Sequence, residues 1–159
     1  MSEHDITLTV NGTAEELTVP ARKLLVHALR EDLDYTGPKV GCESGKCGAC
    51  SVRVDGDVIK SCAMLAVQAD GASVTTVEGV ADEELAPVQS ALHEDHGLQC
   101  GYCTPGMVMT ITDLLEAAPD PSEDEIRRAL KGNVCRCTGY QNVVSAVETA
   151  AENGDGAGE

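Results

Sequence analysis

Apolar and polar side chains alternate at the start of the chain, which is the period of a β-strand with one buried face. Residues 6–10 (Ile-Thr-Leu-Thr-Val) follow this alternation and lead into Asn11-Gly12, a dipeptide typical of tight hairpin turns. Residues 14–19 are predicted to be the returning strand. The pattern therefore predicts that the chain begins with a β-hairpin.

One helix and several short strands are predicted after the hairpin. Apolar residues at helical spacing predict a helix over residues 22–33. Residues 37–50 hold four glycines and three cysteines, so they are predicted to form a tight loop. Together these features predict a small α+β domain over residues 1–78. Its further strands are expected at 51–54, 57–60 and 73–77, with a turn at Asp55-Gly56.

The apolar period becomes helical after a linker predicted at residues 78–82. A first helix is expected over residues 84–95. A second helix is expected to begin at Thr104-Pro105, because threonine is a common N-cap and proline is favoured at the first helical position.

Two more helices complete the second half of the chain. Ser122 and Glu125 have the spacing of a capping box, which opens a third helix, and a fourth is expected over about 141–151. Four short helices with short connections predict a four-helix bundle over residues 79–152. The Gly-rich, acidic residues 153–159 are predicted to be a disordered tail.

The composition supplies an aliphatic core and a strongly acidic surface. Hydrophobic residues make up 42% of the 159-residue chain, but there is no Phe, no Trp and only three Tyr. Acidic residues outnumber basic ones 27 to 11, which gives a formal net charge of −16. Such a surface repels phosphate backbones and anionic membranes, and few rings are present for stacking on bases. Nucleic acids and lipids are therefore excluded as primary partners.

The acidity has a second interpretation. In molar salt the Debye length falls to about 3 Å, so self-repulsion is screened while a hydrated carboxylate surface keeps a protein in solution. The charge balance is typical of a protein from an extreme halophile. The alternatives are an ordinary acidic protein, or an acidic face that docks a basic partner.

Membrane and secretory segments are not expected. No stretch approaches the ~18 apolar residues of a membrane-spanning helix, and residues 1–5 include no basic region before an apolar run. A cytoplasmic location is therefore predicted. Eight cysteines in a reducing compartment are not expected to form a disulfide framework.

The first set of cysteines has the spacing of a plant-type [2Fe–2S] site. Four residues separate Cys42 from Cys47, two separate Cys47 from Cys50, and eleven separate Cys50 from Cys62. Glycines at positions 41, 45 and 48 would let backbone N–H groups turn toward the sulfurs. A structural zinc site is the main alternative, but zinc ligands usually come as two close cysteine pairs. The spacing favours an iron–sulfur cluster.

The second set of cysteines consists of two pairs. Two residues separate Cys100 from Cys103, and one separates Cys135 from Cys137, with 31 residues between the pairs. Each pair precedes a predicted helix, whose N-terminal dipole would stabilise anionic thiolates. Taken alone, these four cysteines are compatible with zinc as well as with a second iron–sulfur cluster.

The cysteine-containing segments together resemble the iron–sulfur subunit of the xanthine oxidase family of molybdenum hydroxylases, of the carbon monoxide dehydrogenase small-subunit type. The resemblance extends over residues 5–150, and its motifs stand in the same order as in the family. The matching segments are residues 41–50 (GCESGKCGAC), 61–62 (SC), 99–107 (QCGYCTPGM) and 132–140 (GNVCRCTGY).

The resemblance implies a fold and a ligand set. It implies a ferredoxin-like β-grasp domain followed by a four-helix bundle, each with one [2Fe–2S] cluster. It also implies that Gln99 and Cys137 contact the molybdopterin cofactor of a large subunit. The implied cluster ligands are Cys42, Cys47, Cys50 and Cys62 for the first cluster, and Cys100, Cys103, Cys135 and Cys137 for the second.

The function implied by the resemblance is electron transfer within an oxidoreductase complex. Electrons would pass from the molybdopterin site through both clusters to FAD on a medium subunit, in a heterotrimer or a dimer of heterotrimers. The sequence ends near residue 159, so the molybdenum and flavin domains are expected on other chains. No catalytic residue is predicted in this chain, because His4, His27, His93 and His96 show no partner pattern.

Two other classes of function remain open from the sequence. A free-standing ferredoxin would need only the first domain, and a zinc-stabilised interaction module would need no redox centre. Co-purification with larger chains separates the relay subunit from a free ferredoxin. Metal content separates both from the zinc module.

Overall fold

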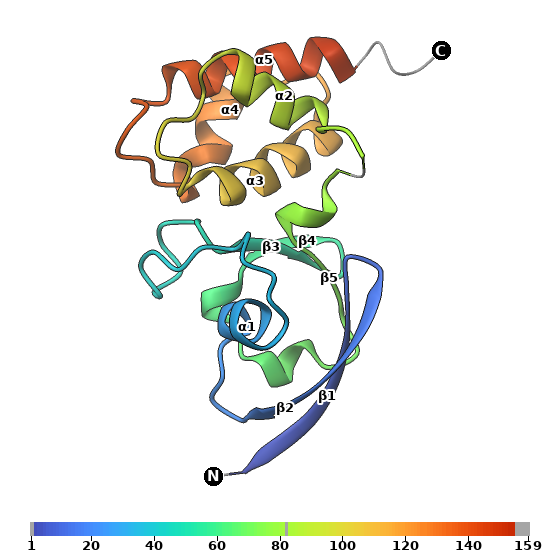
Figure 1. The fold of residues 1–159 in the computed structure, drawn as a ribbon. Helices are drawn as coiled ribbons and strands as arrows, with labels where there is room; N and C mark the ends of the chain where they lie inside the picture. The colour runs from blue at the N-terminus through green and yellow to red at the C-terminus, as the bar shows by residue number, and fades with distance from the viewer. Residues whose placement is uncertain (1, 82, 155–159) are drawn as a thin grey trace.

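The first half of the chain folds as a mixed five-stranded sheet around a short helix. The computed structural model describes residues 2–81 and 83–154. Its sheet has the strand order β2-β1-β5-β3-β4, in which β1 and β5 are parallel and the other neighbours are antiparallel. Figure 1 shows the sheet curving around helix α1. The strands are β1 (Glu3–Val10), β2 (Thr13–Pro20), β3 (Ser51–Val54), β4 (Asp57–Lys60) and β5 (Ser73–Thr75).

The predicted N-terminal hairpin is confirmed. Strands β1 and β2 pair antiparallel up to Val10 opposite Thr13, so Asn11 and Gly12 alone make the turn. Both turn residues have positive φ, 50° and 83°, as a two-residue hairpin turn with the twist of its strands requires. Every second residue of β1 from Ile6 onward is buried, and these side chains face the core.

The helix predicted over residues 22–33 is shorter and changes its winding. Only Leu25–His27 form α1, and Ala28–Asp32 continue as a π-helical turn. The N–H of Leu33 bonds to the carbonyl of Ala28, five residues earlier. Side chains 25, 26, 28 and 29 are all completely buried, which is a wider apolar face than a regular α-helix presents. The wider turn accommodates this packing against the sheet.

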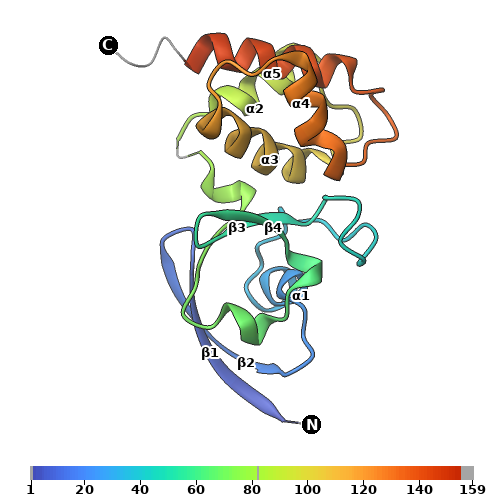
Figure 2. The same cartoon turned by 180° about the vertical axis from the view of Figure 1, so that it is seen from behind.

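Helices α2 (Pro87–Glu94), α3 (Thr104–Ala117), α4 (Glu123–Ala129) and α5 (Gln141–Gly154) make up the second half. Helix α2 packs against α5, and α4 packs against both α3 and α5. Figures 1 and 2 show these helices as a separate layer, with α3 nearest to the sheet, where it packs on β3. The α+β class predicted from the sequence is confirmed.

Each half has its own aliphatic core. The core of the first half includes Leu8, Val10, Leu25, Val52 and Val74. The core of the second half includes Leu92, Met107, Ile111, Ile126 and Val147. These side chains are almost completely removed from solvent, and burial of that kind is the main stabilising contribution to such small units.

The start of α3 differs from the prediction by one residue. Thr104 was expected to be the N-cap, but it is the first helical residue and Cys103 occupies the cap position. The carbonyl of Cys103 accepts the N–H of Met107, which starts the helical hydrogen bonding earlier. Proline stands at the second helical position, where its missing N–H also leaves no bond unmade.

The segment between the halves is held in place. Val77–Gly79 form a 3-10 turn, the N–H of Thr76 donates to the side chain of Asn11 at 2.9 Å, and the N–H of Gly37 donates to Glu78 at 2.6 Å. The predicted tail begins at Asn153, but α5 continues to Gly154. The rest of that tail, residues 155–159, lies outside the described residues.

No helix within residues 2–81 and 83–154 is both long enough and apolar enough to cross a bilayer.

Candidate metal centres

The loop at residues 37–50 wraps backbone N–H groups around one sulfur. The amides of Ser44, Lys46 and Cys47 all donate to Sγ of Cys42, at 3.4, 3.4 and 3.3 Å. Gly45 has a φ of 71°, a conformation that glycine adopts without strain and that lets the chain turn back toward this sulfur. Hydrogen bonds from Ser44, then from the amides of Cys47 and Lys46, lower the pKa of Cys42 to about 5. The loop is therefore built to hold a thiolate.

The other three cysteines of the first set lie around the same loop. Gly41 leaves the space that Sγ of Cys47 fills, because a Cβ at position 41 would overlap this sulfur. Cys50 and Cys62 are buried together beside Val26, on the inner side of the loop. Burial first, and then contact with the Cys50 thiol, raise the pKa of Cys62 although the Gly45 amide opposes the shift.

The second set is assembled from two loops that are distant in sequence. Residues 95–103 connect α2 to α3, and residues 133–140 lead into α5. Cys103 lies next to Cys135, and burial together with this contact raises the pKa of Cys103 to about 12. Cys137 lies next to Cys100, whose amide lowers the Cys137 pKa while the nearby thiol and burial raise it more. The tertiary structure therefore pairs one cysteine of each loop with one of the other.

Thr138 supports the Cys135 sulfur. Its amide and its hydroxyl both donate to Sγ of Cys135, at 3.4 and 3.2 Å. Burial alone would raise the pKa of Cys135, but these two hydrogen bonds, together with those from Cys137 and Cys103, outweigh burial and lower it. As with Cys42, backbone and hydroxyl donors stabilise the anionic form of a potential ligand.

The donor set fits a [2Fe–2S] cluster. Four thiols arranged as two pairs match a group in which each of two irons takes two thiolates. Across residues 2–81 and 83–154, no three cysteine, histidine or acidic side chains gather closely enough to hold one ion. A two-iron group spreads its ligands over a larger volume than one ion does, so both findings are compatible with it.

Exposure to solvent differs among the cysteines of each set. Cys50 and Cys62 are buried and Cys42 is exposed, while Cys103 and Cys135 are half-buried and Cys100 and Cys137 are exposed. Gln99 is also exposed and adjoins Cys100, whose thiol contacts Cys137. The two residues that the resemblance assigned to the pterin, Gln99 and Cys137, therefore lie at the same open end of the second set.

The two cysteine loops touch one another. The N–H of Val134, which precedes Cys135, donates to the carbonyl of Cys47 at 2.8 Å. Gly48 packs so closely on Gly106 and Gly132 that a Cβ at position 48 would overlap the carbonyl oxygen of Gly132, and one at 106 would overlap that of Gly48. This backbone contact joins a proposed ligand of the first set to the segment that carries the second.

Further bonds fasten the two halves around this contact. The hydroxyl of Tyr102 donates to the carbonyl of Val40 at 2.7 Å. On the sheet side, Arg53 of β3 pairs with Glu116 of α3 at 2.8 Å. These contacts therefore hold the two halves together next to the point where the cysteine loops meet.

Three side chains that support the cysteine loops were not predicted from the sequence. The hydroxyl of Thr138 bonds Sγ of Cys135, and the hydroxyl of Tyr140 bonds the backbone on both sides of Val134. His27 lies between Glu31 and Glu43, with ring nitrogens 2.8 and 2.5 Å from their carboxylates. The signal for Tyr140 was its place three residues after Cys137 in a chain almost without aromatic residues. Nothing in the pattern pointed to the His27 contact with Glu43.

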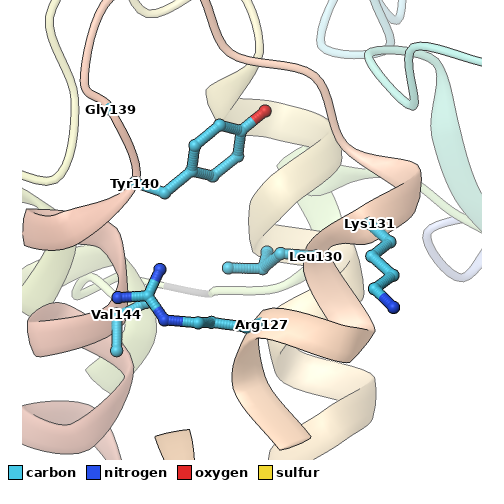
Figure 3. Close-up of a pocket in the computed structure, with 6 residues that line it drawn as sticks. All are labelled: Arg127, Leu130, Lys131, Gly139, Tyr140 and Val144. Atoms are coloured by element: carbon cyan, nitrogen blue, oxygen red, sulfur yellow. The ribbon is translucent and has the colours of Figure 1, made fainter. Parts of the chain in front are cut away.

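A cavity of about 260 Å³ lies beside the second cysteine loop. It is lined by α4, by the turn that follows α4, by the end of the second cysteine loop and by the start of α5, and no cysteine is among its lining residues. Figure 3 shows Tyr140 on one side of this cavity, the guanidinium of Arg127 reaching toward Val144, and the ammonium group of Lys131 pointing away. The cavity therefore adjoins the cysteine loop without forming part of the ligand set.

Comparison with known proteins also indicates [2Fe–2S] binding in both halves of the chain. The model of the 2Fe-2S iron-sulfur cluster binding domain matches residues 8–75, and that of the [2Fe-2S] binding domain matches residues 76–148. The chain is 52% identical to caffeine dehydrogenase subunit gamma of Pseudomonas sp. (strain CBB1), over 95% of this chain and 93% of the relative.

Solved structures agree with these matches. Quinoline 2-oxidoreductase from Pseudomonas putida 86 has a chain with a TM-score of 0.93 and 43% identity, covering 99% of this chain and 98% of that one. Aldehyde oxidoreductase from Desulfovibrio gigas has a TM-score of 0.90 and 44% identity, and the match covers 97% of this chain but only 17% of that longer one.

Proposed function

Since the chain belongs to the iron–sulfur subunits of the xanthine oxidase family of molybdenum hydroxylases, we propose that it relays electrons through two [2Fe–2S] clusters. As a member of this family it is a non-catalytic, electron-transferring subunit of an oxidoreductase. We propose that the electrons come from a molybdopterin site on a large subunit and go to FAD on a medium subunit.

The proposed ligands follow the two cysteine sets. Cys42, Cys47, Cys50 and Cys62 would hold one cluster, and Cys100, Cys103, Cys135 and Cys137 the other. When bound, a [2Fe–2S] cluster supplies a carrier that accepts and releases one electron. This chain supplies the thiolates and the N–H and O–H donors that stabilise them, which are the groups that tune cluster potentials in proteins.

The observation that carries the relay is the contact between the loops. A backbone hydrogen bond of 2.8 Å joins Cys47 to Val134, the residue before Cys135. A free-standing ferredoxin has no need for a second cysteine loop pressed against its first. The close glycine contacts at Gly48, Gly106 and Gly132 support the same conclusion, because they minimise the gap between the two loops.

The position of Gln99 and Cys137 supports a docking direction. Both are exposed at the open end of the second cysteine set, where a pterin on a large subunit could reach them. We assign them the pterin contact that the resemblance implies. The first set would then deliver electrons to the flavin subunit.

The remaining expectations form part of the same proposal. We infer two domains, residues 1–78 and 79–152, the second a four-helix bundle, because each half has its own core. Free thiols suit a reducing cytoplasm, and the assembly is proposed to be a heterotrimer or its dimer.

The relay is tested first by metal analysis and EPR of the purified complex. Two clusters predict about four iron atoms and about four labile sulfides per small subunit, with two distinct S = 1/2 signals after reduction. One signal with half the iron would favour a ferredoxin with a differently used second half. Zinc without a signal would favour an interaction module and overturn the proposal.

Two matched variants test the ligand assignment. Cys42→Ser is expected to remove one EPR signal and Cys100→Ser the other, because the two cysteines belong to different sets. Each variant should also disconnect substrate oxidation from the acceptor. If both variants removed the same signal, or if turnover of the assembled enzyme stayed unchanged, the relay assignment would be wrong.

A further inference from the structure

The hydroxyl of Tyr140 holds the backbone on both sides of one residue. It accepts the N–H of Cys135 at 2.7 Å and donates to the carbonyl of Asn133 at 3.0 Å. The residue between them is Val134, whose own N–H donates to the carbonyl of Cys47. Three consecutive residues are thus oriented by backbone hydrogen bonds, two through Tyr140 and one to the first cysteine loop.

Side-chain packing holds Asn133 and Cys135, at the two ends of this segment, but not Val134 between them. Val134 is 56% exposed, so few neighbouring side chains contact it. Asn133 is buried, and its side chain accepts a hydrogen bond from the hydroxyl of Thr110 at 3.0 Å. Asn133 therefore anchors the segment on one side, and Tyr140 is the group that fixes the direction of the next two peptide units.

The Tyr140 ring packs against the core of the second half, and its hydroxyl adds the two hydrogen bonds to the segment at Val134. Its backbone has a φ of 70°, its N–H bonds the hydroxyl of Thr138, and its carbonyl accepts the N–H of Val144 in the first turn of α5. The ring lines the cavity of about 260 Å³ (Figure 3), so open space lies next to it. Without the two hydroxyl bonds the ring no longer holds the peptide units on either side of Val134, so this segment gains freedom to move.

We propose that the Tyr140 hydroxyl is a positioning group that keeps the Val134 N–H on the Cys47 carbonyl and so sets the rate of electron transfer between the two clusters. This inference rests on the proposed function. With both clusters bound, one electron would pass from the reduced cluster to the oxidised one, and no bond would form or break. A hydrogen bond bridges a shorter gap than a van der Waals contact does, so its loss slows the transfer.

The main test is Tyr140→Phe in the assembled enzyme, followed by rapid freezing and EPR. Both cluster signals are expected to remain, the signal of the second cluster to change shape, and the electron transfer between the clusters to slow by about tenfold. Tyr35→Phe is the matched control, because it removes a hydroxyl that approaches Glu15 at 3.4 Å in the first half, away from the second cysteine set. It should leave the transfer rate and both signals unchanged.

A second variant removes the bridge itself. Val134→Pro deletes the N–H that bonds Cys47, and Asn133 has the extended backbone that a residue before proline requires. The same slowing is expected. If Tyr140 acts through this hydrogen bond, the double variant should be no slower than Val134→Pro alone.

The outcomes separate the inference from the proposed function. An unchanged rate in Tyr140→Phe, or two fully additive effects in the double variant, would contradict the positioning role while the relay stood. A wild-type enzyme with fewer than two cluster signals would overturn the relay itself. Should Tyr140→Phe lose the second cluster, the rate in Val134→Pro decides: slowing supports the bridge, and the wild-type rate refutes it.

Discussion

Individual cysteines of this chain differ in acidity because their surroundings differ. The pKa of Cys42 falls to about 5, since the Ser44 side chain and three amides donate to its sulfur. The pKa of Cys103 rises to about 12, since burial and the nearby Cys135 thiol both disfavour a second thiolate. In the free chain the Cys42 thiol therefore loses its proton more readily than the Cys103 thiol does.

Another single residue, His27, connects α1 to the first cysteine loop. Its ring lies between Glu31 in the π-helical turn and Glu43 next to Cys42. The hydrogen bond with Glu43, and then the one with Glu31, raise the pKa of His27 above its ordinary value although partial burial opposes the shift. A protonated His27 therefore binds the loop more strongly than a neutral one.

Replacing His27 with glutamine tests this contact through its pH dependence. A raised folded-state pKa gives stability that is fully present below the unfolded pKa of about 6.5 and is lost as pH rises through the folded value. The thermal midpoint of wild type should therefore exceed that of His27→Gln most at low pH, and the difference should shrink above pH 6.5. Scanning calorimetry of the complex between pH 6 and 9 measures it.

The control for this prediction is His93→Gln, which removes an exposed histidine on α2. It should follow the wild-type profile. A wild-type advantage over His27→Gln that grew with pH would contradict the assigned role.

Helices and strands of the chain begin and end largely where local chemistry sets them. The hairpin turn at Asn11-Gly12 and the opening of α4 at Ser122 were both predicted and are both observed. The departures occur where tertiary contacts compete with local preference. Complete burial of four side chains widens α1 into a π-helical turn, and the cysteine loop before α3 moves its cap from Thr104 to Cys103.

The capping box of α4 gives a prediction at this scale. The amide and hydroxyl of Ser122 both donate to Glu125, at 2.8 and 2.6 Å. Ser122→Ala removes the hydroxyl and should lower the thermal midpoint by about 2–4 °C, the usual size of a lost N-cap in a chain of this length. Ser145→Ala in the interior of α5 is the control, because alanine is the better helix former there. Equal losses in both variants would exclude a capping effect.

At the scale of the whole molecule, two cores are joined by backbone contacts, by the packing of α3 on β3 and by the ion pairs of Arg53. Arg53 of β3 pairs with Asp113 and Glu116 of α3, which places a base of the sheet against acids of the helical half. These ion pairs neutralise only a small part of the acidic charge, since the formal net charge is −16. Long-range repulsion between the two acidic halves therefore acts against the junction where the cysteine loops meet.

Salt is expected to relieve this repulsion. Because screening is nearly complete in molar salt, the thermal midpoint of the complex should be higher in 2 M KCl than in 0.1 M KCl, as the halophilic interpretation of the surface predicts. Differential scanning fluorimetry at the two concentrations measures it. Equal midpoints would leave the acidic surface as an ordinary one or as a docking face.

The sequence by itself determined the elements and the chemistry of the two cysteine sets. Strand alternation, turn dipeptides and caps are local, and the spacing from Cys42 to Cys50 limits what one loop can bind. The contact between the two loops, in contrast, joins residues that are far apart in the sequence. No pattern indicates that Val134 bonds the carbonyl of Cys47 across 87 positions, or that Tyr140 holds this residue in place.

Only the tertiary structure decided which thiols lie together and how the halves meet. Cys100 lies beside Cys137 and Cys103 beside Cys135 because α3 and α5 pack on a shared core, which sets the distance between their preceding loops. The first cysteine loop packs closely on α3 and on the turn before the second loop because Gly48, Gly106 and Gly132 carry no side chain there. Packing distances between residues far apart in sequence depend on every side chain between them, so they emerge only when the chain has folded.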